Sequence, residues 1–150
     1  MIVRWGLDAL PDVLDEIGSE RPLLVSTERW RGVELPVAER FHGAQSHAEK
    51  AGVEAGTEQA TEADGLVALG GGSAIDTAKA VSAATGLPLV SIPTTYAGAE
   101  WTSYFGTRDA IAGTKGGGGG AHLAGIVYEP SLTLDLPRAE SGGTAMNGIP

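Results

Sequence analysis

Three consecutive glycines, Gly70, Gly71 and Gly72, stand between an apolar run at 65–69 and Ser73, where a helical pattern starts. Glycine has no Cβ, so its backbone can approach an oxygen anion closely and can adopt a positive φ. The first N–H groups of the following helix have no partner within the helix, and they carry the positive end of its dipole. One glycine would be enough for a plain strand-to-helix turn. The run therefore predicts a site for phosphate, the natural ligand of such a place.

Ser73 and Asp76 have the S-x-x-D spacing of a capping box, in which side chains bond the free N–H groups at a helix start. This spacing predicts that the helix begins at or near Ser73, which would set the direction of those N–H groups. The stretch matches neither G-x-G-x-x-G nor the P-loop pattern. Lys79 comes too late in the helix to act as a P-loop lysine.

A second polar cluster, Thr94 and Thr95 with Gly98, follows the next apolar strand. Ligands of open α/β sheets bind outside the carboxyl ends of the strands, and both clusters belong to that edge. The two threonines offer hydroxyl groups there, and Gly98 permits close approach of a ligand. An ordinary turn that ends the strand is the alternative interpretation.

Glu28 follows an earlier apolar strand at 22–27. An acidic residue just past such a strand often binds a ribose hydroxyl. A solvated loop charge explains Glu28 equally well, so both interpretations stay open. His42, His47 and His122 show no metal-ligand spacing and the chain has no cysteine, so no metal site is expected.

The elements that must position these residues form a βαβ unit. Apolar strands at 65–69 and 87–93 flank a helical pattern at 73–86, and Gly86 is a natural helix stop. Two such strands should be parallel, with a right-handed crossover. Together with the strand at 22–27, the unit predicts an α/β fold with a Rossmann-like parallel sheet and helices on both faces.

Three features outside this unit also carry expectations. The stretch "TKGGGGGAH" at 114–122 holds five consecutive glycines and predicts a flexible loop. The stretch at 123–137 predicts a further strand, a turn and an extended piece. Trp101, Tyr104 and Phe105 are expected to pack under the domain rather than to form an interface.

Composition limits the functional classes. The chain has 150 residues, which suits one domain, and its net charge of −9 without a basic stretch argues against nucleic-acid binding. It lacks an apolar run of the length that a membrane helix requires, about 18 residues, and its N-terminus has no signal-peptide pattern. We therefore expect a cytoplasmic protein that does not bind membranes.

The stretches "GGGSAIDTAKA" at 70–80, "IPTTYAGAE" at 92–100 and "GIVYEPSLTLDLP" at 125–137 resemble the iron-containing alcohol dehydrogenase superfamily, to which glycerol dehydrogenase and dehydroquinate synthase are related. Within it the chain is most similar to maleylacetate reductases, because "PTTYAGAE" is one residue shorter than the P-T-T-x-G-T-G-S-E of metal-dependent members. Asn147 in "AMNG" takes the place of their metal-binding Asp, which implies metal independence.

The resemblance implies a site for a nicotinamide dinucleotide, NAD(H) or NADP(H). The glycine motif would hold the pyrophosphate, and the next strand end would contact the phosphate and the nicotinamide ribose. The residues so implied are Gly70, Gly71, Gly72, Ser73, Asp76, Thr94 and Thr95. Glu28 falls near the family's acidic residue for the adenosine ribose, which favours NADH because a carboxylate repels a 2′-phosphate.

Family members continue into a C-terminal helical domain that supplies the substrate side of the active site. Residues 1–150 are therefore expected to be the dinucleotide-binding domain with the helical domain absent, and no catalytic residue is assigned. The implied function is an NAD(P)-dependent oxidoreductase that moves a hydride between nicotinamide and a carbonyl or alcohol carbon of a small molecule. The alternatives are a free-standing nucleotide-binding module without catalysis, and an interaction protein with an empty glycine loop. In a homo-oligomer, a partner chain would have to close the cleft.

Overall fold

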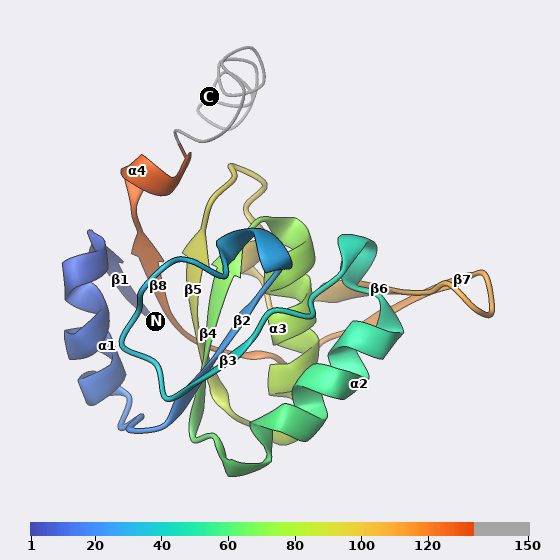
Figure 1. Ribbon diagram of the computed structural model, residues 1–150, viewed down its shortest axis with the longest axis horizontal. Helices are drawn as coiled ribbons and strands as arrows, with labels where there is room; N and C mark the ends of the chain where they lie inside the picture. Colours follow the sequence, from blue (N-terminus) through green and yellow to red (C-terminus); the bar gives the residue numbers. More distant parts are fainter. Residues whose placement is uncertain (134–150) are drawn as a thin grey trace.

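A six-stranded parallel sheet forms the centre of the computed structural model, which describes residues 1–133 (Figure 1). The strands are β1 (Ile2–Trp5), β2 (Pro22–Ser26), β3 (Glu39–Phe41), β4 (Gly65–Gly70), β5 (Pro88–Pro93) and β8 (His122–Tyr128). Their order across the sheet is β1-β8-β5-β4-β2-β3, and every neighbouring pair is parallel. The predicted α/β fold is confirmed, and the three predicted strands are the adjacent β2, β4 and β5.

Helices cover both faces of the sheet. They are α1 (Leu10–Glu16), α2 (Lys50–Gln59), α3 (Gly72–Thr85) and the short α4 (Pro130–Thr133). Side chains of β4 alternate between the faces, as expected for a strand buried on both sides. Leu66 belongs to the core under α2 and α3 with Ile75, and Val67 belongs to the opposite core with Leu10 of α1. Within residues 1–133 no helix is long and apolar enough to cross a membrane.

The predicted βαβ unit is present as β4, α3 and β5. Helix α3 begins at Gly72 and ends before Gly86, whose φ of 78° is the left-handed conformation typical of a glycine cap. Ala74 and Ala78 are buried against the sheet, and their small side chains let the helix lie close to it. The unit brings the first turn of α3 to the carboxyl edge of β4 and β5.

The expectation of a flexible loop at 114–122 is wrong. Strands β6 (Phe105–Asp109) and β7 (Thr114–Gly118) form an antiparallel hairpin, with Phe105 opposite Gly118, and His122 already begins β8. The ladder needs only backbone groups, so the absence of side chains does not prevent it. A Cβ on Gly117 would lie 2.6 Å from the carbonyl oxygen of Phe105. Glycine therefore permits a close approach of the two strands here.

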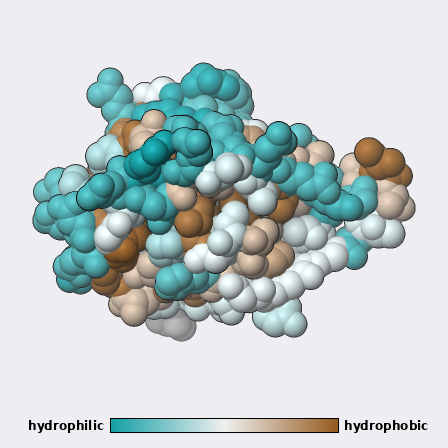
Figure 2. Space-filling view, turned by 90° about the horizontal axis from the view of Figure 1, so that it is seen from below, coloured by the Kyte–Doolittle hydropathy of each residue, from teal (hydrophilic) through white to brown (hydrophobic). Residues whose placement is uncertain are grey.

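The aromatic residues that follow β5 lie mostly at the surface. The expectation that they pack under the domain is wrong for Trp101 and Tyr104, which are 52% and 74% exposed, whereas Phe105 is half-buried. The tip of the β6–β7 hairpin is also apolar and exposed, as Figure 2 shows, and Ile111 there is fully exposed. Neither the aromatic segment nor the hairpin tip belongs to the core.

Strand β8 joins the first strand to the rest of the sheet. It lies between β1 and β5, and Gly125 is the partner of Ile2 in one register and of Val90 in the other. The strand predicted within 123–137 is thus confirmed and is followed by helix α4. The extended piece expected at 134–137 lies outside the described residues.

Candidate functional site

A pocket of about 190 Å³ lies at the carboxyl ends of β2, β4 and β5, and we call it the turn pocket. It is lined by Thr27, Arg29, Trp30, Gly71, Gly72, Ser73, Ala74, Thr94, Thr95 and Leu132. Five of these were predicted from the sequence as ligand-binding residues. The structure thus brings together the glycine turn and the threonine pair, which lie some twenty residues apart in the chain.

The glycine turn joins the ends of β4 and β5. Gly70 has a φ of 143°, a conformation that side chains rarely adopt, and its carbonyl accepts a 2.9 Å hydrogen bond from the N–H of Thr94. A Cβ on Gly71 would lie 3.0 Å from the Cγ2 atom of Thr95. A Cβ on Gly72 would meet nothing within 4 Å, so the backbone of this residue faces open space. Gly70 supports the turn, and Gly71 and Gly72 form the surface of the pocket.

The first turn of α3 is not closed by the predicted capping box. Gly71 is the N-cap, so Ser73 and Asp76 stand two residues too far along the helix for that role. The Ser73 hydroxyl instead accepts a 3.1 Å hydrogen bond from the N–H of His47, and Asp76 Oδ2 accepts one of 3.3 Å from the N–H of Gly106. The helix start therefore presents its free N–H groups without a side-chain cap from its N-cap residue, beside an open pocket.

Lys79 on α3 acts away from the turn pocket. Its ammonium group is 1% exposed and donates hydrogen bonds to the carbonyl oxygens of Ala99 (2.6 Å) and Thr102 (2.8 Å). It also lies 3.5 Å from Asp76 Oδ1. Lys79 thus fastens the 99–102 segment to α3. Asp76, predicted as a cofactor residue, contacts Lys79 and the β6–β7 hairpin and does not line the turn pocket.

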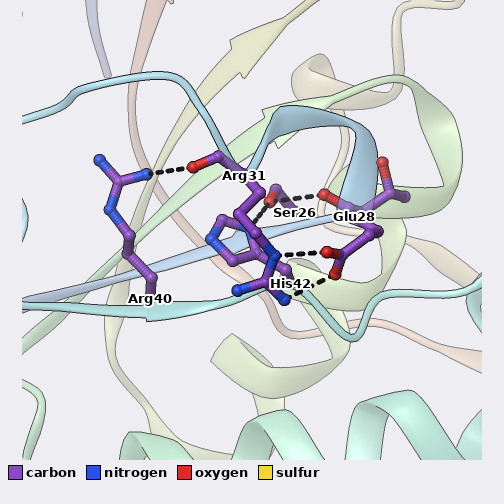
Figure 3. A network of polar contacts seen from close by, with 6 residues as sticks. Ser26, Glu28, Arg31, Arg40 and His42 are labelled. Atoms are coloured by element: carbon purple, nitrogen blue, oxygen red, sulfur yellow. Dashed lines mark hydrogen bonds and ion pairs between the residues drawn. The ribbon is translucent and has the colours of Figure 1, made fainter.

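Glu28 stands in a 3-10 turn (Glu28–Trp30) that follows β2 (Figure 3). Its carboxylate accepts two hydrogen bonds from Arg31, one from Nε and one of 2.7 Å from Nη2. The hydrogen bond from Arg31 holds the pKa of Glu28 below its usual value. The Glu28 side chain is 69% exposed, and its neighbours Thr27 and Arg29 line the turn pocket. Glu28 therefore forms a solvated ion pair with Arg31 at the rim of the turn pocket. Its contact with a ribose stays a prediction.

The histidines have separate surroundings. Nδ1 of His42 lies 2.6 Å from the Ser26 hydroxyl, and burial lowers the pKa of His42, with Arg31 and Arg40 lowering it further. In the described part of the chain, no group of three or more acidic or histidine side chains is arranged to hold a metal ion. Asn147, on which the expectation of metal independence rests, lies outside the described residues.

The structure adds an aromatic pocket of about 610 Å³ that the sequence did not indicate. It borders the turn pocket at Thr95 and holds a chain of hydrogen bonds in its wall. The Trp101 indole donates to the Tyr128 hydroxyl (2.8 Å), and this hydroxyl donates to the buried Glu100 carboxylate (2.9 Å). Burial and then Glu100 raise the pKa of Tyr128 to about 12. Tyr128 lies 28 and 27 residues after the adjacent Glu100 and Trp101, so no local pattern could have revealed the network.

Comparisons with known proteins identify relatives of the whole described region. The sequence profile of the iron-containing alcohol dehydrogenases matches residues 3–123. Maleylacetate reductase from Pseudomonas knackmussii is 38% identical over 156 residues, which cover 96% of this chain and 44% of that protein. Maleylacetate reductase 1 from Cupriavidus pinatubonensis is 35% identical, with 94% and 43% covered. The chain thus spans less than half the length of these relatives.

Solved structures share the fold. The maleylacetate reductase from Rhizobium sp. strain MTP-10005 has a TM-score of 0.86 at 28% identity, covering 97% of this chain and 45% of that one. An iron-containing alcohol dehydrogenase from Corynebacterium glutamicum has a TM-score of 0.85 at 31% identity, covering 98% and 45%. A sulfoacetaldehyde reductase from Bifidobacterium kashiwanohense, solved in complex with NAD+, shows the same fold with a TM-score of 0.83 at 21% identity, covering 98% and 49%.

Proposed function

The chain belongs to the iron-containing alcohol dehydrogenase family, and on that premise we propose that it binds a nicotinamide dinucleotide in the turn pocket. The observation that carries the proposal is the bare backbone of Gly71 and Gly72 at the uncapped start of α3, on the wall of a pocket. A pyrophosphate needs such a cradle of N–H groups, and α3, with 14 residues, is long enough to carry a sizeable dipole.

The residues present fit the dinucleotide. The N–H groups of Gly72 and Ser73 would bind phosphate oxygens, since a Cβ on Gly72 would point into open space that a ligand can fill. The hydroxyls of Thr94 and Thr95 would contact the phosphate and the nicotinamide ribose from the β5 side. The cofactor would supply the hydride chemistry, and this chain would orient it.

We further propose that the chain is the cofactor-binding part of an NAD(P)-dependent oxidoreductase that acts on a carbonyl or alcohol carbon, as the names of its relatives suggest. In this proposal the reaction needs no metal from this chain, takes place in the cytoplasm and involves neither nucleic acid nor membrane. A homo-oligomer is part of this proposal.

A nucleotide-binding module without catalysis is the second candidate. One observation favours it: among the described residues that line the turn pocket there is no histidine, aspartate or glutamate to move a proton. Turnover of maleylacetate and of simple alcohols, measured with and without EDTA, separates the two candidates. Activity that disappears with the chelator would contradict the metal-free proposal.

Fluorescence titration with NADH and NADPH tests the binding itself. We expect saturable binding that Gly71→Val abolishes, because a branched side chain would crowd Thr95 and occupy the phosphate position. Gly119→Val is the matched control, since Gly119 is exposed after β7 and a Cβ there would meet only the edge of Tyr104, at 4.0 Å. Absence of saturable binding by either dinucleotide, or normal binding by Gly71→Val, would refute the assignment.

A further inference from the structure

Arginine side chains gather at the carboxyl end of β2, although the chain as a whole has a net charge of −9. Arg29 lines the turn pocket, and Arg31 follows directly after the 3-10 turn that carries Glu28. Arg40 comes from β3, the edge strand that pairs with β2. Arg29 and Arg31 therefore belong to the same edge of the sheet as the turn pocket. Arg40 stands opposite Leu24 of β2 and contacts the backbone of Arg31.

Glu28 does not act there as a lone negative charge. Both of its carboxylate oxygens accept hydrogen bonds from Arg31, as Figure 3 shows. Arg40 Nη1 donates to the backbone oxygen of Arg31 at 3.4 Å, which holds the Arg40 guanidinium beside the backbone of Arg31. The side chains of Arg31 and Glu28 are 64% and 69% exposed, so their ion pair is weak and Arg31 can turn toward a ligand.

The pKa of the neighbouring His42 is consistent with a positive potential from Arg31 and Arg40. Burial lowers the pKa of His42, and the charges of Arg31 and Arg40 lower it further, whereas Glu28 raises it without reversing the shift. The arginines thus outweigh the glutamate at this point. An anion placed beside His42 would be attracted for the same reason.

We propose that Arg31 and Arg40 bind the 2′-phosphate of the adenosine ribose, so that the site prefers NADPH to NADH. The inference rests on the proposed function and names its cofactor. In α/β dinucleotide sites an acidic residue at this strand end binds the free 2′-hydroxyl, whereas a nearby arginine accommodates a 2′-phosphate. Guanidinium groups match phosphate oxygens with paired donors. This proposal differs from the expectation of NADH, which considered Glu28 without its pairing to Arg31.

Titrations with NADPH and NADH at low salt test this preference directly. We expect NADPH to bind about tenfold more tightly, the effect of about one charge-assisted hydrogen bond. The preference should decrease when KCl is raised from about 50 mM to about 500 mM, because exposed charges are screened. Adenosine 2′,5′-bisphosphate should likewise displace NADH better than ADP does, since the two probes differ in the 2′-phosphate.

Variants identify the residues responsible. Arg31→Gln and Arg40→Gln should each weaken NADPH binding several-fold and leave NADH binding within about twofold, since NADH lacks the 2′-phosphate. Glu28→Gln should tighten NADPH binding by releasing Arg31. Arg21→Gln is the matched control, because Arg21 is an exposed arginine paired with Glu62 and remote from the turn pocket. It should change neither affinity.

Three results would overturn the inference. Saturable NADH binding that is as tight as NADPH binding would refute the 2′-phosphate site and leave the proposed function intact. Equal weakening of both dinucleotides by Arg31→Gln would show that Arg31 supports the fold rather than the phosphate. Failure of both dinucleotides to bind the unaltered chain would refute the proposed function, and the inference with it.

Discussion

Replacing Lys79 by methionine should lower the free energy of unfolding, because the buried ammonium group of Lys79 donates hydrogen bonds that methionine cannot make. The group is 1% exposed and donates to the carbonyl oxygens of Ala99 and Thr102 at 2.6 and 2.8 Å. A third contact, with the Thr102 hydroxyl, is 3.3 Å long. Methionine fills nearly the same volume but has no donor, so both carbonyls would lose their charged partner.

The expected loss is about 2 kcal/mol. Hydrogen bonds to a charged group contribute roughly 1.5–3 kcal/mol each, so the two short bonds of Lys79 together contribute about 4 kcal/mol. Methionine has no charge to desolvate, and this saving offsets roughly half of the 4 kcal/mol. For a urea m-value of about 2 kcal/mol/M, a 2 kcal/mol loss moves the unfolding midpoint by about 1 M.

Urea unfolding followed by circular dichroism measures this shift. Lys50→Met is the matched control, because Lys50 is an exposed lysine on α2 that forms an ion pair with Glu54 at 3.7 Å. The free energy of unfolding of Lys50→Met should differ from that of the unaltered chain by less than about 0.5 kcal/mol. If Lys79→Met unfolds at the same urea concentration as the unaltered chain, the buried ammonium does not stabilise the 99–102 segment, and our account of Lys79 is wrong.

Three further changes have defined outcomes. Gly72→Ala should raise the free energy of unfolding by about 0.5 kcal/mol in urea melts, because alanine is the better helix former and its Cβ would meet no other atom within 4 Å. The same variant should weaken dinucleotide binding at least about tenfold. Burial raises the pKa of Asp64, but hydrogen bonds from Ser19 and backbone N–H groups lower it below 3.8 overall. Asp64→Asn should therefore cost about 1 kcal/mol at neutral pH, and the difference should vanish in melts taken as the pH falls below 3.8. Tyr128 should remain protonated at pH 10 in ultraviolet titrations, because burial and Glu100 raise its pKa to about 12; any stability linked to this shift is present below pH 10 and is lost as the pH rises through 12.

The sheet and half of the site could be predicted because they depend on local patterns. The apolar run before Gly70, the glycines themselves and the helical spacing after Ser73 are contiguous in the chain. Parallel strands bring their carboxyl ends to one edge, so the meeting of the glycine turn with Thr94 and Thr95 follows from topology.

The remaining features depend on contacts that no local pattern contains. The β6–β7 hairpin forms because the glycine run lies against Phe105–Asp109, and strand propensity says nothing of that encounter. Both carboxylate oxygens of Glu28 accept hydrogen bonds from Arg31, and the position of Glu28 after a strand does not reveal this pairing. The N-cap of α3 is Gly71, two residues before Ser73, so the predicted capping box does not form.

The position of β8 has a consequence for synthesis on the ribosome. Strand β1 precedes the other described strands in the chain, but among them it pairs with β8 alone, joining Ile2 to Gly125. Strands β2, β4 and β5 can assemble while translation continues, whereas β1 must wait until residues 122–128 have left the exit tunnel. Closing so long a loop is slow, because contacts distant in sequence form late. Until β8 has been made, Ile2–Trp5 therefore has no partner strand, and the β5 edge that β8 covers stays open.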